Sequence, residues 1–213
     1  MSGAPDCPVC RSSATETFLH VEGKSYHRCA MCAARFLDPA DRPGRAAERR
    51  HYTLHDNRVD DPGYRKFLSR LTRELLPRLR PGLDGLDYGC GPGPALAAML
   101  EEAGHRMTLY DPAFRPDATA LDRQYDFITC TETAEHFHDP ATEFARLGRM
   151  LKPGGMLGVM TCFQTDDACF AGWHYRRDPT HVIFYRQETF RAIARSNGWR
   201  CVCPVKDIAL IYI

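Results

Sequence analysis

The sequence predicts an α/β protein with a mostly parallel sheet, preceded by a small metal-binding module. An apolar strand runs into a glycine-rich turn at residues 83–94, and apolar strands then alternate with amphipathic helices. Two Cys-x-x-Cys pairs near the start of the chain indicate the metal-binding module. We therefore expect a ribbon at residues 1–40, a linker or lid at 41–61 and the α/β domain at 62–213.

Composition limits the function classes. With 213 residues, 44% of them hydrophobic, the chain can bury one substantial core and a small appendage. The net charge is +1, and residues 1–45 hold six Lys and Arg against five Asp and Glu, so a nucleic acid is a disfavoured partner. With no apolar run of membrane-spanning length and no signal-peptide pattern, we expect a cytoplasmic protein with no membrane partner. The sequence gives no indication of an oligomeric state.

Four cysteines near the N-terminus predict a structural zinc site. Cys7 and Cys10 form one Cys-x-x-Cys pair, Cys29 and Cys32 form another, and 18 residues separate the pairs. Cytoplasmic thiols stay reduced, and four thiolates at this spacing suit a closed tetrahedral Zn²⁺ site with no position for a catalytic water. Reduced cysteines without metal and a redox dithiol are the alternatives, and two pairs without a βαβ unit disfavour the redox one.

The segment between the cysteine pairs predicts a hairpin. Thr17–Val21 and Lys24–Arg28 alternate polar with apolar side chains around a turn at Glu22–Gly23. This is a zinc-ribbon layout. So small a unit has little core, and zinc would supply much of its stability.

The next segment, Leu37–Asp61, is rich in Pro, Arg, Asp and His and predicts a linker or loosely packed connection. Tyr52 and His55 lie near its end, where they are candidates for a lid over a ligand or for a solvated loop. Apolar residues at helical spacing follow in Pro62–Leu79, which predicts an amphipathic helix packed on the sheet.

The glycine-rich turn is the strongest ligand-binding feature. Gly89, Gly91 and Gly93 follow an apolar strand, and glycines let the backbone approach a ligand while the next helix presents free N–H groups. The third glycine comes too early for a dinucleotide fingerprint, and prolines flank it. Asp87 adds a carboxylate that would repel a diphosphate and attract a cation. The turn therefore predicts a nucleotide-like cofactor with a positive charge.

The remaining elements follow in alternating order. A strand ends in Asp111, about 20 residues past the glycines, where an acid can bind ribose hydroxyls. A second strand opens into Thr131 and the residues after it, and the chain closes with a helix and a hairpin. The expected elements are helix Ala95–Ala103, strand Met107–Tyr110, strand Tyr125–Cys130, helix Pro140–Met150, strand Met156–Thr161, helix Gln187–Asn197 and hairpin Trp199–Val205 with Ile208–Ile213.

Two motifs carry a resemblance to a known family. Leu86–Gly93 resembles motif I of the class I S-adenosylmethionine-dependent methyltransferases, and Leu-Lys-Pro-Gly-Gly at Leu151–Gly155 is a common trait of these enzymes. The resemblance implies a Rossmann-like fold with a C-terminal antiparallel hairpin, S-adenosylmethionine as cofactor, and a ribose-binding role for Asp111. The cofactor-binding residues predicted on this basis are Asp87, Tyr88, Gly89, Cys90, Gly91, Gly93, Asp111, Pro112, Thr131, Glu132 and Tyr52.

One interval departs from the family pattern. Only 14 residues separate Asp111 from Asp126, where the family usually fits a helix, a third strand and an acidic adenine-binding turn. We therefore expect a shortened sheet edge, with adenine held by apolar and backbone contacts.

Acceptor chemistry is assigned to residues that follow strand ends. Glu135, His136 and His181 are the candidate catalytic residues, the last within the aromatic and cationic stretch Trp173–Tyr185. In that stretch Arg176 could meet an anionic substrate or lie on a solvated surface. We expect methyl transfer to O, N or C of a small molecule. An RNA- or protein-directed methyltransferase, or an inactive cofactor-binding scaffold with the ribbon as recognition module, is the alternative.

Overall fold

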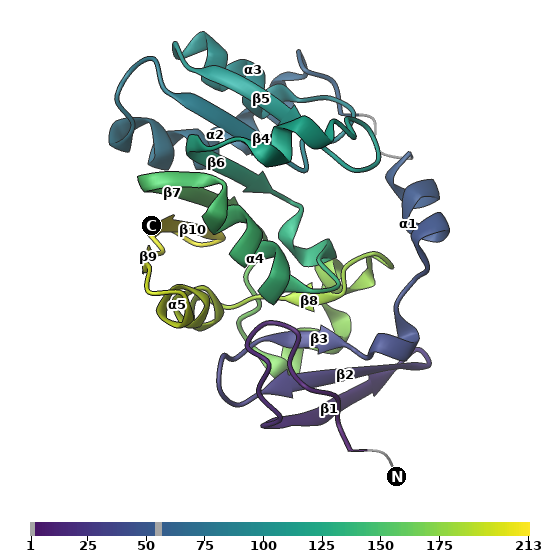
Figure 1. Ribbon diagram of the computed structural model, residues 1–213. Helices are drawn as coiled ribbons and strands as arrows, with labels where there is room; N and C mark the ends of the chain where they lie inside the picture. The colour runs from purple at the N-terminus through teal and green to yellow at the C-terminus, as the bar shows by residue number, and fades with distance from the viewer. Residues whose placement is uncertain (1–2, 54–56) are drawn as a thin grey trace.

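The computed structural model describes residues 3–53 and 57–213, and its strands form two sheets (Figure 1). The strands are β1 Thr15–Val21, β2 Lys24–Cys29, β3 Arg35–Leu37, β4 Asp84–Tyr88, β5 Arg106–Tyr110, β6 Tyr125–Thr131, β7 Leu151–Met160, β8 Ile183–Phe184, β9 Arg200–Val202 and β10 Ile208–Tyr212. The α-helices are α1 Arg45–Tyr52, α2 Pro62–Leu75, α3 Ala95–Glu102, α4 Pro140–Arg149 and α5 Gln187–Ser196. None of the described helices has both the length and the apolar character needed to cross a membrane.

The larger sheet has the strand order β5-β4-β6-β7-β10-β9. Its first four strands are parallel, whereas β10 runs antiparallel to both β7 and β9. The predicted α/β class, the mostly parallel sheet and the C-terminal hairpin are therefore confirmed. Apart from β7, the helices and strands expected after the glycine turn are present within a few residues of their predicted bounds.

Helices cover both faces of this sheet because side chains along each strand alternate in direction. Phe127 packs with α2 and α3 in one apolar cluster, whereas its neighbour Ile128 packs with α4 and α5 in another. Met156 and Leu157 divide between the same two clusters. The strand β7 begins at Leu151, earlier than predicted, since the Leu-Lys-Pro-Gly-Gly stretch continues the ladder beside β6 through a bulge instead of forming a loop.

The sheet ends at β5, which confirms the shortened edge. Between Asp111 and Asp126 the described chain forms one short 3-10 helix, Ala118–Asp122, and no further strand. Tyr125 at the start of β6 donates a hydrogen bond to Ala120 and fixes this helix against the sheet. An interval of 14 residues was too short for a helix and a strand, which is why the prediction held.

The smaller sheet has the antiparallel order β1-β2-β3-β8. Its hairpin turns at Glu22 and Gly23, both with φ in the left-handed region, as the sequence predicted. The strand β8 comes from the loop after β7, so a segment far along the chain completes the ribbon's sheet. Phe170 packs edge-on against Tyr26 of β2 and Phe184 of β8, which places the ribbon in a core shared with the larger domain.

The segment expected to be a linker contains helix α1. Gly44 precedes the helix, and the Ala-Ala-Glu-Arg-Arg run that follows favours helix formation more than its charged composition suggested. Figure 1 shows α1 at the side of the molecule, between the ribbon and the larger sheet. The lid candidate His55 lies outside the described residues, whereas Tyr52 ends α1.

Candidate functional site

The glycine turn, Gly89–Gly93, lies at the carboxyl end of β4. Gly89 and Gly91 have φ of 81° and 63°, which side-chain-bearing residues rarely adopt. A Cβ at Gly89 would collide with the side chain of Thr133, and one at Gly93 with the backbone oxygen of Asn57. At Gly91 a Cβ would meet only open space. The turn is thus held tightly on two sides and open at its centre.

Asp111 fixes the open centre of the turn. Its Oδ2 accepts a hydrogen bond from the Gly91 N–H at 3.0 Å, and its Oδ1 accepts from the N–H groups of Ala113 at 2.8 Å and Phe114 at 3.1 Å. An ionised carboxylate has about four lone-pair sites, so one is left for a ligand hydroxyl. The geometry is compatible with the predicted ribose role and adds a structural role that the sequence did not indicate.

Asp87 provides a second carboxylate beneath the turn. The side chain is buried, and its Oδ1 accepts one hydrogen bond, from Thr129 at 2.8 Å. Burial raises the pKa of Asp87 to about 6, the Thr129 hydrogen bond opposes the shift, and the negative charge of Asp111 adds to it. A cationic ligand would favour the ionised form of this carboxyl. The charge distribution therefore fits a positively charged ligand.

The end of β6 carries an unusual backbone and an unused hydroxyl. Thr131 Oγ1 is buried and has no hydrogen-bond partner within the described part of the chain. Glu132 has φ of 47°, in the left-handed region, and burial together with the charge of Glu135 raises its pKa to about 9. A ligand hydrogen bond would satisfy the Thr131 hydroxyl.

The other predicted cofactor residues make protein contacts with their side chains. Tyr88 donates its hydroxyl to Glu143 of α4 at 2.6 Å, and the Cys90 thiol is buried against its own turn. Pro112 is exposed at the end of β5, and the Tyr52 ring packs edge-on against His136 at 5.2 Å between centroids. Tyr88 and Cys90 can therefore serve a cofactor through their backbone alone.

A histidine cluster, Glu135, His136 and His181, lies beyond the end of β6. Glu135 has no exposed surface, and its carboxylate accepts hydrogen bonds from Tyr175 Oη at 2.5 Å and Thr161 Oγ1 at 2.9 Å. His181 Nε2 lies 4.0 Å from the same carboxylate. The structure therefore brings all three predicted catalytic residues together.

Backbone carbonyls orient both imidazoles of the histidine cluster. His136 Nδ1 lies 3.0 Å from the Thr180 oxygen, and His181 Nδ1 lies 2.7 Å from the Tyr175 oxygen. Because a carbonyl only accepts, each Nδ1 carries the proton and each Nε2 keeps its lone pair when the ring is neutral. Burial lowers the pKa of His181 and favours this neutral form. The ring centroids are 4.8 Å apart.

Helix α1 packs over this region through two polar contacts. His138 Nε2 lies 2.6 Å from Glu48, and His51 Nε2 lies 3.2 Å from Asp178. Burial opposes ionisation of Asp178, but hydrogen bonds from Thr180 outweigh it and lower its pKa to about 2.

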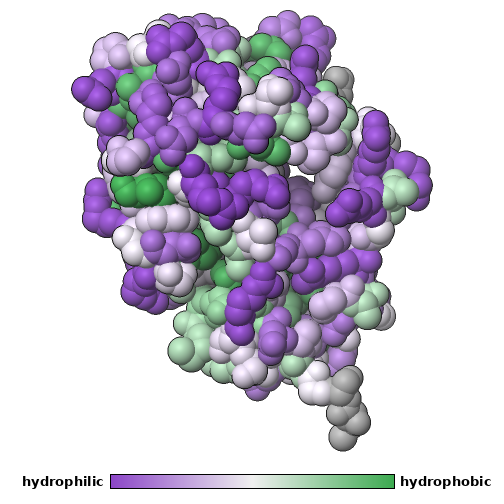
Figure 2. Space-filling view, viewed as in Figure 1, coloured by the Kyte–Doolittle hydropathy of each residue, from purple (hydrophilic) through white to green (hydrophobic). Residues whose placement is uncertain are grey.

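A cavity of about 520 Å³ lies beside α1, and Figure 2 shows mostly hydrophilic residues over that helix. The cavity is lined by Pro43, Ala47, Arg50, His51, Thr53, Pro179 and Thr180.

Thr133 joins the glycine turn to the histidine cluster. Its Oγ1 contacts the Gly89 oxygen at 3.2 Å and the Thr131 oxygen at 2.9 Å, and its methyl group packs where a Gly89 side chain would lie. Two residues later the chain reaches Glu135. One short segment, residues 131–136, therefore contacts both halves of the site.

A family model described as a methyltransferase domain matches residues 61–203. The chain belongs to this methyltransferase family. Ubiquinone biosynthesis O-methyltransferases from Sodalis glossinidius and Klebsiella pneumoniae are 32% identical over 82 residues and 30% over 88, covering 38% and 41% of this chain. The matches span 33% and 36% of those relatives, so the chain aligns with about a third of their length.

Solved structures agree on the fold. The magnesium protoporphyrin IX methyltransferase of Synechocystis PCC 6803, with S-adenosylhomocysteine (SAH) bound, has a TM-score of 0.53 at 16% identity, covering 78% of this chain and 93% of that chain. The 1,6-didemethyltoxoflavin-N1-methyltransferase of Burkholderia thailandensis, with 1,6-didemethyltoxoflavin and SAH bound, has a TM-score of 0.50 at 17% identity, covering 92% and 97%. At these identities the likeness establishes the Rossmann-like fold alone.

The four cysteines of this methyltransferase chain converge at the ribbon. Cys7 and Cys32 sulfurs are 3.5 Å apart, Cys10 and Cys29 sulfurs are 3.6 Å apart, and all four lie within 4.8 Å of one another. Tetrahedral zinc with Zn–S bonds of about 2.3 Å needs sulfurs about 3.8 Å apart. The donor set and spacing therefore fit a four-thiolate zinc site.

The two cysteine pairs also share a backbone geometry. The residue after each pair, Arg11 or Ala33, has φ near 60° and donates its N–H to the oxygen of the first cysteine, at 2.8 and 3.1 Å. Equal turns present their thiols in the same way, as zinc knuckles do.

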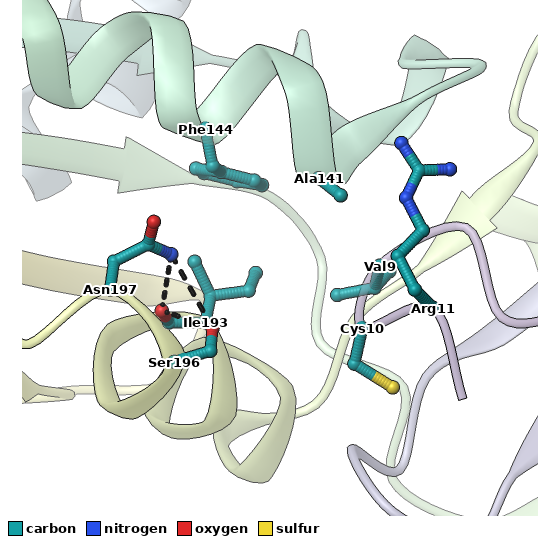
Figure 3. Close-up of a pocket in the computed structure, with 8 residues that line it drawn as sticks. All are labelled: Val9, Cys10, Arg11, Ala141, Phe144, Ile193, Ser196 and Asn197. Carbon is teal, nitrogen blue, oxygen red and sulfur yellow. Dashed lines mark hydrogen bonds between the residues drawn. The ribbon is translucent and has the colours of Figure 1, made fainter.

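A cavity of about 200 Å³ lies between the first cysteine pair and helices α4 and α5 (Figure 3). The cavity is lined by Val9, Cys10, Arg11, Ala141, Phe144, Ile193, Ser196 and Asn197.

Sequence reasoning missed the contacts of two residues that organise the candidate site. Tyr175 donates to Glu135 and packs against His181 at an interplanar angle of 53°, with centroids 4.1 Å apart, and only its place in an aromatic-rich stretch pointed to it. Arg176, considered as a substrate contact or a solvated residue, is buried and donates to Glu22 and Tyr26 of the ribbon. Both predictions for Arg176, a substrate contact and a solvated residue, were wrong. Its guanidinium instead joins the ribbon to the loop that carries Tyr175.

Proposed function

We propose that this chain is an S-adenosylmethionine-dependent methyltransferase that acts on a small-molecule acceptor. The observation that carries the proposal is the segment Thr131–His136, which links the glycine turn to the histidine cluster through Thr133. Such a link holds a donor site and a proton-accepting site at a fixed separation, and an in-line transfer depends on that alignment.

The glycine turn is proposed as the donor side of the reaction. S-adenosylmethionine, when bound there, supplies an electrophilic methyl group on a sulfonium. Asp111 would accept from a ribose hydroxyl through its remaining lone pair, Thr131 would satisfy its unpartnered hydroxyl, and Asp87 would offset the positive charge. Tyr52, at the end of α1, packs edge-on against His136 of the histidine cluster and is proposed as a lid residue.

The histidine cluster is proposed as the acceptor side. His181 Nε2 holds a lone pair and can accept the proton of an acceptor hydroxyl or amine. The Glu135 carboxylate, 4.0 Å away, would stabilise the imidazolium that forms, while Tyr175 and Thr161 hold that carboxylate in place. His136 would orient the acceptor beside it.

The ribbon is proposed as a zinc-stabilised scaffold for the acceptor side. Arg35 of β3 makes a two-point contact with Asp167, at 2.8 Å for each bond, and Arg176 reaches back to Glu22. Asp167 and Arg176 both lie in the loop that carries Tyr175 and His181. This supports a scaffold over a separate recognition module, and the need for reduced thiolates supports the predicted cytoplasmic location.

A small-molecule acceptor is supported by the relatives. The relatives from Sodalis glossinidius and Klebsiella pneumoniae are named for ubiquinone biosynthesis, and the Burkholderia thailandensis enzyme has 1,6-didemethyltoxoflavin bound. The cavity beside α1, of about 520 Å³, has a volume typical of sites that bind small organic molecules.

Calorimetric titration of the full chain with S-adenosylmethionine and SAH tests the proposal. We expect both to bind, and Asp111→Asn to weaken binding about 10- to 100-fold, because an amide loses charge-assisted hydrogen bonds from the turn. Asp122→Asn makes the same charge change at an exposed position and serves as the matched control. Absence of binding by the wild-type protein would overturn the proposal, and equal affinity in Asp111→Asn would remove the ribose role.

A further inference from the structure

The histidine cluster has the composition of a second metal site. One ligand atom from each of Glu135, His136 and His181 lies within 4.8 Å of the others. Bonds of about 2.0–2.2 Å from nitrogen and oxygen to a zinc-like ion place ligand atoms about 3.3–3.6 Å apart. His181 Nε2 and the Glu135 carboxylate lie at 4.0 Å, so side-chain rotation has to bring the ligand atoms closer together when a metal binds.

The imidazoles are prepared for coordination. Each Nδ1 donates to a backbone carbonyl, of Thr180 or Tyr175, and this leaves each Nε2 as a free lone pair. Metal-binding histidines are typically held in this way, because the second hydrogen bond fixes the tautomer and the ring orientation. A general base needs one such imidazole, whereas the cluster supplies two adjacent rings, packed edge to face.

The carboxylate of the cluster lacks a full counter-charge. Glu135 is completely buried, and both of its hydrogen bonds come from neutral hydroxyls, Tyr175 and Thr161. Among the described residues, His181 is the one basic side chain within 4.0 Å of it. The Glu132 carboxyl group also accepts from Tyr175, at 3.3 Å. Burying a carboxylate without a cation is costly, and a divalent ion would supply the missing charge.

We propose that Glu135, His136 and His181 bind a divalent transition-metal ion of the zinc or iron(II) class, separate from the ribbon's four-thiolate site. Two imidazoles and one carboxylate suit these ions and leave coordination positions for water or for an oxygen of the acceptor. A metal would take both Nε2 lone pairs, so the cluster would lower the pKa of a bound hydroxyl in place of accepting its proton directly. Only this last consequence rests on the proposed function.

Metal stoichiometry of the full chain is the first test. The protein is equilibrated with Zn²⁺, freed of excess metal and analysed by mass spectrometry, and we expect about two ions per chain. His136→Asn and His181→Asn keep an amide donor for the carbonyl but place no nitrogen at the Nε2 position, so each should retain about one ion. His174→Asn, at an exposed histidine of the same loop, is the control and should retain both.

Equal zinc content in the wild type and in both cluster variants would overturn the metal site. X-ray absorption at the zinc edge of the wild-type protein provides a second measurement that does not depend on the variants folding. Mixed sulfur and nitrogen or oxygen coordination is expected, and sulfur-only coordination would overturn the inference. Neither measurement needs a methyl donor, so failure of the metal site leaves donor binding intact, and failure of donor binding leaves the metal result standing.

Discussion

The Asp111 contacts of the glycine turn and the contacts of the histidine cluster span different distances along the chain. In the glycine turn, the bond from Gly91 to Asp111 spans 20 residues, and Asp111 makes its other two bonds within three residues. Around the histidine cluster, Tyr175 and Glu135 are 40 residues apart, and Glu48 and His138 are 90 apart. Asp111 is therefore held by local contacts. Asp87 and Gly89 accept hydrogen bonds from Thr129 and Thr133, 42 and 44 residues away, and the acceptor half draws on segments up to 90 residues apart.

The ribbon contacts the loop of the histidine cluster. It contributes β3 as the neighbour of β8, and its Arg35 and Glu22 bond to the loop on either side of Tyr175. Within residues 3–53 and 57–213, the side-chain hydrogen bonds of Asp87 and Asp111 involve no residue of the ribbon. Perturbing the ribbon should therefore affect the histidine cluster before the glycine turn, and the following variants test this in order of expected effect.

Loss of zinc should have the largest effect. Cys29→Ser removes one of four thiolates, and because the ribbon shares its sheet and core with the larger domain, we expect a loss of about 4–5 kcal/mol in unfolding free energy. The melting temperature would fall by about 10–20 °C for a chain of this size. Cys169→Ser, at an exposed thiol, is the control. Unchanged melting in zinc-free protein would show that metal does not support the fold.

Glu135→Gln should have the next largest effect, on turnover. The amide keeps the size of the side chain but removes the charge that faces His181, so we expect methyl transfer to fall about 10²- to 10⁴-fold. Donor affinity measured by calorimetry should stay within about twofold, a change of roughly 0.4 kcal/mol. Glu101→Gln on the exposed face of α3 is the matched control. Turnover like that of the wild type would remove Glu135 from the reaction.

Arg35→Gln should have an intermediate effect. The guanidinium is nearly buried and makes two bonds to Asp167, which is itself partly exposed and shared with Arg186. We expect a loss of about 1–3 kcal/mol in stability and a higher KM for the acceptor, with donor affinity retained. Arg11→Gln removes an exposed pair with Asp139 and should cost less than about 1 kcal/mol. Equal weakening of donor and acceptor binding would contradict the separation of the two halves.

The same contrast explains what the sequence could predict. Motif order alone located β4, the glycine turn, Asp111 and the closing hairpin, because the pattern that marks each element is carried by residues adjacent in the sequence. The helix α1 and the burial of Arg176 were missed because their partners, Asp178 and Glu22, lie 127 and 154 residues away. Glu135 and His181 were each predicted from their positions after strand ends. Their proximity depends on the hydrogen bond from the Val182 N–H to the Glu135 backbone oxygen, a contact that no sequence motif encodes.

The smallest effect is expected from the titration of Asp87. Burial raises its folded-state pKa to about 6, above the value of about 3.9 expected in the unfolded chain. The folded state therefore holds this proton more tightly, so the group's contribution to stability is full below about pH 4 and is lost as pH rises through 6.

Donor binding should have the opposite pH dependence. S-adenosylmethionine carries a sulfonium charge that SAH lacks, so it should prefer the ionised carboxylate, and the ratio of their affinities should fall by up to about tenfold per unit below pH 6. Calorimetry of both ligands between pH 5 and 8, values chosen to bracket the Asp87 pKa of about 6, measures this ratio. In Asp87→Asn the ratio should be independent of pH. A slope that persists in the variant would assign the titration to another group and leave Asp87 a structural residue under the turn.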